Sequence, residues 1–152
     1  RLVKNGKNMM REEGRLSELL ARIGESDPDD FAVRKRLAET AIAKTDYPAA
    51  VHWSNRALEI DVTDAEVHRA FAVALAGSHN YAGAVEEFQT AVDLDPKGVP
   101  QRIGLAEALL EAGRPREARK ALEALRKIAP SHPGMKQLTD KIEKTDPRAP
   151  PR

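Results

Sequence analysis

Apolar and small side chains recur along this chain with a period of 34 residues. Alanine repeats at this spacing in two registers, Ala50, Ala84 and Ala118, and Ala38, Ala72 and Ala106. Larger apolar side chains follow the same spacing at Leu37, Phe71 and Leu105. A fixed period of this size predicts stacked repeats, in which no single unit can bury its own apolar face.

Within each period, apolar positions at helical spacing predict two helices joined by a short turn. In the middle unit these are residues 65–77 and 81–94, on either side of Ser78-His79-Asn80. Pro96 ends the second helix because proline cannot continue it. The same reading predicts helices at 31–43 and 47–60 in the unit before, and at 99–112 and 115–128 in the unit after.

The pattern divides the chain into three full units with partial ones at both ends. The predicted ranges are 1–10 (trailing end of a preceding domain), 11–28 (N-terminal half-repeat helix), 29–62, 63–96 and 97–130 (repeats 1 to 3), 131–144 (C-terminal capping helix) and 145–152 (disordered tail). The half-repeat rests on Leu16, Leu20 and Ile23, which lie one period before Ala50, Ser54 and Ala57. The tail has three prolines and no apolar periodicity.

These residues resemble the tetratricopeptide-repeat family over about residues 29 to 132. The resemblance rests first on the small residue of the first helix (Ala38, Ala72 and Ala106) and on the turn followed by an aromatic residue (Asp46-Tyr47 and Asn80-Tyr81). It rests also on the later alanine (Ala57 and Ala91) and on the Asp-Pro pair that ends the unit (Asp95-Pro96). It implies an all-α fold, a right-handed superhelix of helix-turn-helix hairpins (an α-solenoid). Three positions depart from the family pattern. His68 stands where a large aromatic residue is frequent, His79 replaces the turn glycine, and Leu125 replaces the later alanine.

Composition and charge exclude several partners. The 25 basic and 24 acidic residues give a net charge of +1, whereas a nucleic-acid-binding domain normally carries a basic excess on one face. We therefore expect no nucleic-acid partner. No apolar run approaches the length of a membrane span, so no direct membrane insertion is expected. The sequence assigns no compartment, and its start at Arg1 is interpreted as the start of a fragment of a longer polypeptide.

No candidate chemistry in the sequence amounts to an active site. The chain has no cysteine, and its four histidines lack the i, i+4 spacing of a helical metal site. Asp27, Asp29 and Asp30 lie at a predicted helix start, where capping explains them better than catalysis does. Gly104 is isolated on a predicted helix and is interpreted as a point of tight packing. We expect no catalytic residue, no metal and no cofactor.

The family resemblance implies a concave groove lined by the first helices of successive hairpins, which receives a peptide or a partner's helix. By register the groove residues are Lys35, Glu39 and Ile42; Glu66, Arg69, Val73 and Ala76; and Ile103, Glu107 and Leu110. Lys35 and Arg69 are expected to pair with carboxylates of the ligand. The alternative is that all ten residues are merely solvated. The family's clamp for acidic chaperone C-termini is not expected, because Glu39 and Val73 stand where it needs polar or positive side chains.

Three functional hypotheses remain from the sequence. The leading one is a non-catalytic scaffold that binds a protein or peptide ligand in its groove. The second is an accessory region of a larger enzyme, for example a peptidase, or of an assembly factor, which positions its catalytic domain or substrate. The third is self-association through the end faces at Leu16 and Leu20 or at Met135 and Ile142.

Overall fold

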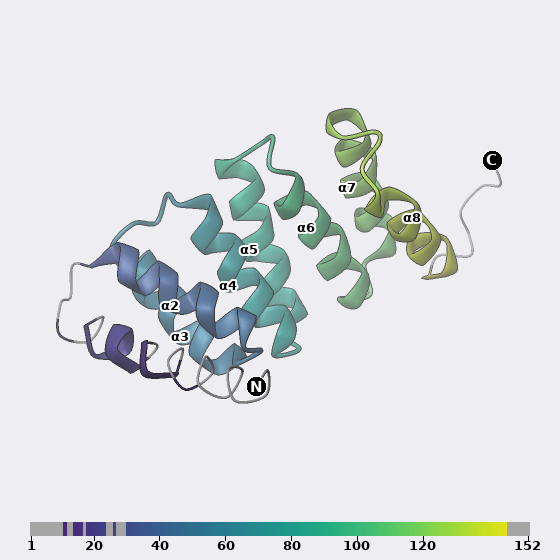
Figure 1. Cartoon of the computed structure of the whole chain (residues 1–152). Coiled ribbons are helices and arrows are strands. Elements are labelled where there is room, and N and C mark those ends of the chain that lie inside the picture. Colours follow the sequence, from purple (N-terminus) through teal and green to yellow (C-terminus); the bar gives the residue numbers. More distant parts are fainter. Residues whose placement is uncertain (1–10, 12–13, 17, 24–25, 27–29, 146–152) are drawn as a thin grey trace, which may run out of the picture.

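The computed structural model describes residues 11, 14–16, 18–23, 26 and 30–145, and among these no strand occurs (Figure 1). The fold is the predicted all-α solenoid, a right-handed superhelix of helix-turn-helix hairpins. Residues 14–16 and 18–23 are helical and precede α2. The helices that follow are α2 (Phe31–Ala43), α3 (Tyr47–Leu58), α4 (Ala65–Gly77), α5 (Tyr81–Leu94), α6 (Val99–Glu111), α7 (Pro115–Ile128) and α8 (Gly134–Thr145).

Side-chain caps fix where four of these helices begin. The carboxylates of Asp30 and Asp46 accept hydrogen bonds from the N–H groups of Val33 (2.9 Å) and Ala49 (3.2 Å). Asp64 and the amide oxygen of Asn80 cap α4 and α5 in the same way. Such caps satisfy N–H groups that have no partner within the helix. The capping interpretation is confirmed for Asp30, whereas Asp27 and Asp29 lie outside the described residues.

The turn inside each hairpin has the same geometry in all three units. Thr45, His79 and Gly113 occupy equivalent positions and adopt positive φ angles of 56°, 62° and 70°. In each case the residue after them donates its N–H to the carbonyl five residues back, at 2.8–2.9 Å. This is the Schellman arrangement, which glycine enters most easily because it has no Cβ. His79, and the β-branched Thr45 even more, therefore carry backbone strain that Gly113 avoids.

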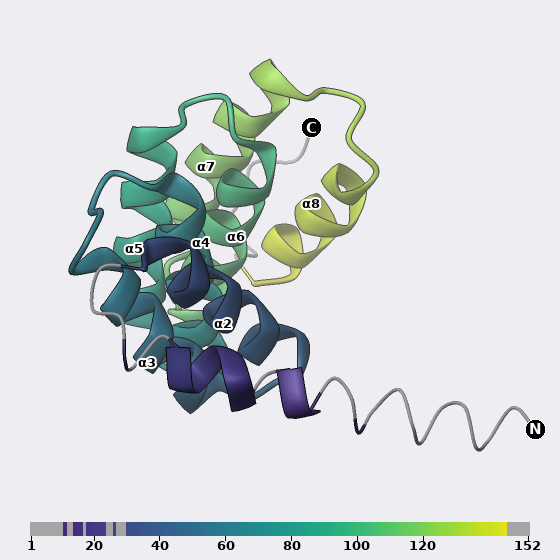
Figure 2. The same cartoon turned by 60° about the vertical axis from the view of Figure 1, so that its left-hand side comes forward.

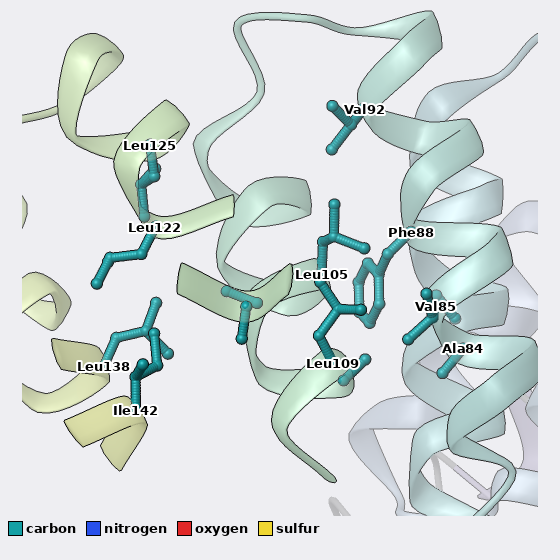
Figure 3. Packing of buried hydrophobic residues seen from close by; sticks show 14 of the residues in the cluster. Ala84, Val85, Phe88, Val92, Leu105, Leu109, Leu122, Leu125, Leu138 and Ile142 are labelled. Atoms are coloured by element: carbon teal, nitrogen blue, oxygen red, sulfur yellow. The ribbon is translucent and has the colours of Figure 1, made fainter. Parts of the chain in front are cut away.

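Close helix contacts at alanine form the centre of the stack. Ala50, Ala84 and Ala118 are all 0% exposed. Around them the main core extends from Val85 and Phe88 on α5 to Leu138 and Ile142 on α8 (Figure 3). Gly104 lies against Phe88 so closely that an added Cβ would collide with the ring. The interpretation of Gly104 as a point of tight packing is thus confirmed.

The stack has two different faces, which follow from how the helices alternate. The even-numbered helices contact one another, α2 with α4, α4 with α6 and α6 with α8. Within residues 30–145, no such contact joins α3 to α5 or α5 to α7. We call the side of α2, α4, α6 and α8 the inner face and the side of α3, α5 and α7 the outer face (Figure 2). The stack curves with the inner face on its concave side.

The helix boundaries differ little from those predicted. α3 ends at Leu58 rather than at residue 60, because the N–H groups of Ile60 and Asp61 both turn back to the carbonyl of Ala57 (3.0 and 3.1 Å). α6 ends one residue earlier than predicted, and α8 extends to Thr145. The interpretations of residues 1–10 and 146–152 concern parts of the chain outside the described residues.

The two apolar end faces considered for self-association are not alike. Met135 and Ile142 are buried in the main core, so the hypothesis of an exposed face at these residues is wrong. The reason is that α8 turns its apolar side onto the last hairpin. At the other end Leu20 packs against the cluster of Leu37 and Trp53, but Leu16 is 57% exposed.

Replacing Ala84 by leucine tests the close helix contact. We expect Ala84→Leu to lower the free energy of unfolding by about 1–3 kcal/mol, because a fully buried contact cannot accept three further carbons without strain. Urea denaturation measures the change. The control is Ala82→Leu at an exposed position of the same helix, which should leave stability nearly unchanged. Equal stability of the two variants would contradict the assigned contact.

Replacing Thr45 by glycine tests the strained turn. We expect Thr45→Gly to raise the free energy of unfolding by about 0.5–1 kcal/mol, because the relief of the positive-φ strain exceeds the entropic cost of glycine. The reverse change, Gly113→Thr, should destabilise the equivalent turn of the third unit. Thermal melting of both variants checks the pair, and a loss of stability in Thr45→Gly would show that this turn is not strained.

Candidate functional site

A cavity of about 340 Å³ on the inner face brings together four of the ten predicted groove residues, Arg69, Val73, Ile103 and Glu107. Its other lining residues are Phe88, Val99, Pro100, Gly104 and His132. The cavity therefore lies between α4 and α6, beside the loop that precedes α8.

The cavity has an apolar lining and a polar rim. Phe88 reaches it from α5 because Gly104 has no side chain to fill the space between them. Val73 and Ile103 are half-buried and pack against the main core from the inner side. Arg69, Glu107 and His132 add polar groups. Apolar walls with a few polar groups are typical of sites that hold one bulky apolar side chain of a ligand.

Each charged groove residue already has a polar or charged partner, on its own helix or on a neighbouring one. The Lys35 ammonium contacts the Asp64 carboxylate at the start of α4 (2.7 Å). The Glu66 carboxylate accepts from Arg69 (2.8 Å) and from the amide of Gln101 at the start of α6 (3.0 Å). These contacts form a polar ladder along the inner face, which ends with Glu107 and Lys141 of α8 (3.6 Å). A ligand carboxylate would have to share Lys35 and Arg69 with these partners.

Asp64 is the most strongly held carboxylate of the ladder. Partial burial would raise the pKa of its carboxyl group, but hydrogen bonds from Lys35 and from the N–H groups of Val67 and Glu66 outweigh that effect. The pKa of Asp64 is therefore lowered below its ordinary value of 3.8. The group caps α4 and pairs with α2 at the same time, so it joins the first unit to the second.

The other six predicted groove residues lie outside the cavity, and two of them, Lys35 and Glu66, belong to the polar ladder. Glu39 is exposed, with its carboxylate 4.0 Å from the Arg36 guanidinium. Ile42, Ala76 and Leu110 are half-buried and pack against the core clusters beneath them. They contribute apolar surface at one end of their helices.

Several inner-face residues were missed by the sequence reasoning. Gln101 is 1% exposed and links Glu66 to Asp95, a role that polar character alone does not reveal. Pro100 lies one period after Glu66, so the same register would have placed it in the groove. His132 lies in the loop before α8, where no periodic signal exists.

The histidines have structural surroundings. The ring of the buried His68 contacts the Glu87 carboxylate through Nδ1 (2.7 Å) and the Val62 carbonyl through Nε2 (3.0 Å). His79 contacts the Tyr81 hydroxyl (2.8 Å). In the described ranges, no group of three His, Cys, Asp or Glu residues is arranged to hold a metal ion. No helix there is long and apolar enough to cross a membrane.

Comparison with known proteins agrees with this geometry. Residues 75–142 match the family model for the tetratricopeptide repeat. These residues, somewhat less than half of the chain, therefore carry tetratricopeptide repeats. The small residues, turns and Asp-Pro close noted in the sequence follow the same pattern. The tetratricopeptide fold is generally a non-catalytic scaffold for protein interactions.

This chain is similar to a curated protein and to many solved structures. It is 26% identical over 112 residues to Superkiller protein 3 of Saccharomyces cerevisiae, which is 70% of this chain and 8% of the yeast protein. The crystal structure of MamA superposes with a TM-score of 0.79 at 17% identity, covering 92% of this chain and 88% of MamA. The TPR2B domain of yeast Sti1 in complex with pHsp70 superposes with a TM-score of 0.70 at 25% identity, covering 76% of this chain and 98% of that domain.

Removing Lys35 tests the first step of the polar ladder. At neutral pH we expect Lys35→Met to be about 0.3–1 kcal/mol less stable than the wild type, since the pair is only partly buried. A carboxyl group with a lowered pKa contributes to stability above its unfolded pKa of 3.8. This contribution is lost as the pH falls through the pKa of the folded state. The difference should therefore vanish in acid, once Asp64 is protonated.

Urea unfolding of both proteins near neutral pH and in acid, well below the ordinary pKa of 3.8, measures this dependence. Lys136→Met, at an exposed position of α8, is the control and should show little change at either pH. A difference between Lys35→Met and wild type that persists unchanged in acid would contradict the pairing.

Proposed function

We propose that this chain is a non-catalytic tetratricopeptide scaffold that binds a peptide or helical segment of a partner protein on its inner face. The observation that carries the proposal is the cavity between α4 and α6, with Val73, Ile103 and Phe88 as its apolar lining. In this proposal one bulky apolar side chain of the ligand occupies the cavity, and the rest of the segment runs along the inner face.

The polar ladder supports this mode of binding. Because Lys35, Glu66 and Glu107 tie successive inner helices together, the inner surface is held in one shape before the ligand arrives. A preformed surface lowers the ordering cost of binding. Arg69 and His132 at the cavity then supply donors for the ligand's carbonyl or carboxylate groups.

The yeast Sti1 domain was solved with pHsp70, but we do not propose the same ligand for this chain. Glu39 and Val73 take positions where a clamp for an acidic chaperone terminus needs polar or positive side chains. An exposed carboxylate at Glu39 would repel such a terminus. The proposed ligand is therefore defined by its apolar anchor rather than by a terminal carboxylate.

Peptide selection followed by a point variant tests the proposed function. Peptides are selected on the wild-type protein from a random phage-displayed library, synthesised with a fluorophore and measured by fluorescence anisotropy. We expect Ile103→Lys to weaken binding at least about tenfold, because the ammonium group replaces the apolar wall of the cavity. A milder change, Arg69→Gln, should weaken binding less while it keeps the fold intact.

The matched control is Val62→Lys, which places the same ammonium group at an exposed position of the loop before α4. Its affinity should equal that of the wild type, and circular dichroism should show the same helix content in all variants. Failure to select any binding peptide, or equal affinity of wild type and both inner-face variants, would refute inner-face binding.

A further inference from the structure

A second and larger hollow lies on the outer face. It has a volume of about 710 Å³ and lies between α5 and α7, with α6 beneath it. Its apolar lining comes from Val85 and Val92 on α5, Leu105 and Leu109 on α6, and Ala121 and Ala124 on α7. We call this hollow the outer groove. It shares no lining residue with the inner cavity.

The outer groove exists because of how the helices pack. α5 and α7 both contact α6, but they do not contact each other. Val85 of α5 points toward Leu105 and Leu109 of α6, which form the floor (Figure 3). On the α7 side the apolar lining residues are the small Ala121 and Ala124, which lie beside the charged Glu117 and Lys120. Apolar side chains therefore line the bottom of the hollow, where Val85, Val92, Leu105 and Leu109 are 4–7% exposed.

One difference between successive repeats distinguishes this groove from the equivalent place in the preceding unit. In the preceding unit His68 of α4 contacts Glu87 of α5 (2.7 Å) and also the Val62 carbonyl. One period later these positions hold Arg102, Ala121 and Pro96. Arg102 keeps the equivalent backbone contact, donating to the Pro96 carbonyl from Nε (3.1 Å) and Nη2 (2.7 Å).

The third unit has no carboxylate equivalent to that of Glu87. Ala121 stands where Glu87 stands one period earlier, and no carboxylate within residues 30–145 forms an ion pair with Arg102. A half-buried guanidinium group thus lines an apolar groove with hydrogen-bonding capacity to spare. A ligand carboxylate at this place could pair with Arg102, as Glu87 pairs with His68 in the preceding unit.

The charges around the outer groove favour an acidic ligand. Its lining includes the cations Arg102, Arg114 and Lys120 and the anions Glu86 and Glu117. Glu117 is engaged by Arg114 through two hydrogen bonds of 2.7 Å. These bonds raise the pKa of the Arg114 guanidinium and lower the pKa of the Glu117 carboxyl, so both stay charged and paired.

The wider surroundings of the outer groove also carry a positive net charge. Residues 97–145, which include α6, α7 and α8, contain eleven Lys and Arg against six Asp and Glu. Residues 30–96 contain six Lys and Arg against eleven Asp and Glu. The outer groove therefore lies at the edge of the basic half of the stack, which attracts an acidic segment and repels a basic one.

We propose that the outer groove binds an acidic amphipathic helix of a partner protein. The apolar face of that helix lies on Leu105 and Leu109, between the walls formed by α5 and α7. One of its carboxylates pairs with Arg102, in the place that Glu87 occupies beside His68. This interaction is independent of the inner-face function, so the chain would hold two partner segments on opposite faces.

Two designed peptides serve as probes. Both are amphipathic helices of about four turns with one leucine stripe. One carries glutamate on both flanks of the stripe, and the other carries lysine at the same positions. Fluorescence anisotropy measures their binding to the wild type. We expect the glutamate peptide to bind at least tenfold more tightly than the lysine peptide.

Variants of the groove locate the contact. Ala121→Glu supplies the missing carboxylate from within and narrows the groove, and should weaken the glutamate peptide at least tenfold. Arg102→Gln should weaken it as well, and provides the test if Ala121→Glu does not fold. The matched control is Ala32→Glu at an exposed position of α2, which should leave binding unchanged.

Several results would overturn the proposal. These are no detectable binding of the glutamate peptide, equal binding of the two peptides, or equal affinity of the wild type and both groove variants. A loss of binding in Ile103→Lys instead would assign the acidic peptide to the inner face. Light scattering of the protein alone tests whether a second copy of this chain occupies the outer groove. If the protein self-associates and Ala121→Glu abolishes the association, the occupant is this chain and not a partner helix.

Discussion

The close approach of helices at alanine is the constraint on which the rest of this structure depends. Ala50, Ala84 and Ala118 are completely buried, so a larger side chain at these contacts would have to displace its neighbours. Because each unit packs in this way, the inner helices come into contact with one another while the outer helices diverge. The concave inner face and the open outer groove are two consequences of the same packing. Both candidate binding surfaces therefore follow from the small side chains of the core.

One repeat position shows how a regular stack acquires local differences. Arg34, His68 and Arg102 are equivalent, and each donates to a backbone carbonyl, of Arg56, Val62 and Pro96 respectively. Arg34 is buried, and His68 has Glu87 as a second partner. Only Arg102 faces an open groove. The same position thus serves packing in two units and is available for recognition in the third.

The helices and their order could be predicted from the sequence because the 34-residue register repeats the same signal three times. The inner-face residues of α4 and α6 could be placed for the same reason. Which charges pair could not, because partners such as Lys35 and Asp64 meet only once the relative position of two units is known. The unpaired Arg102 of the outer groove was missed because it depends on a position where the repeats differ, Glu87 in one unit and Ala121 in the next. A comparison that looks only for residues shared by all repeats overlooks such a difference.

A map of amide chemical-shift changes, recorded by NMR during titration with a library-selected peptide, tests the central claim most directly. The account predicts that the changes concentrate on the inner sides of α4 and α6, around Val73, Ile103 and Gly104, and that α3 and the outer side of α7 stay unaffected. Changes confined to the outer face, or scattered evenly over all helices, would contradict an inner-face binding site.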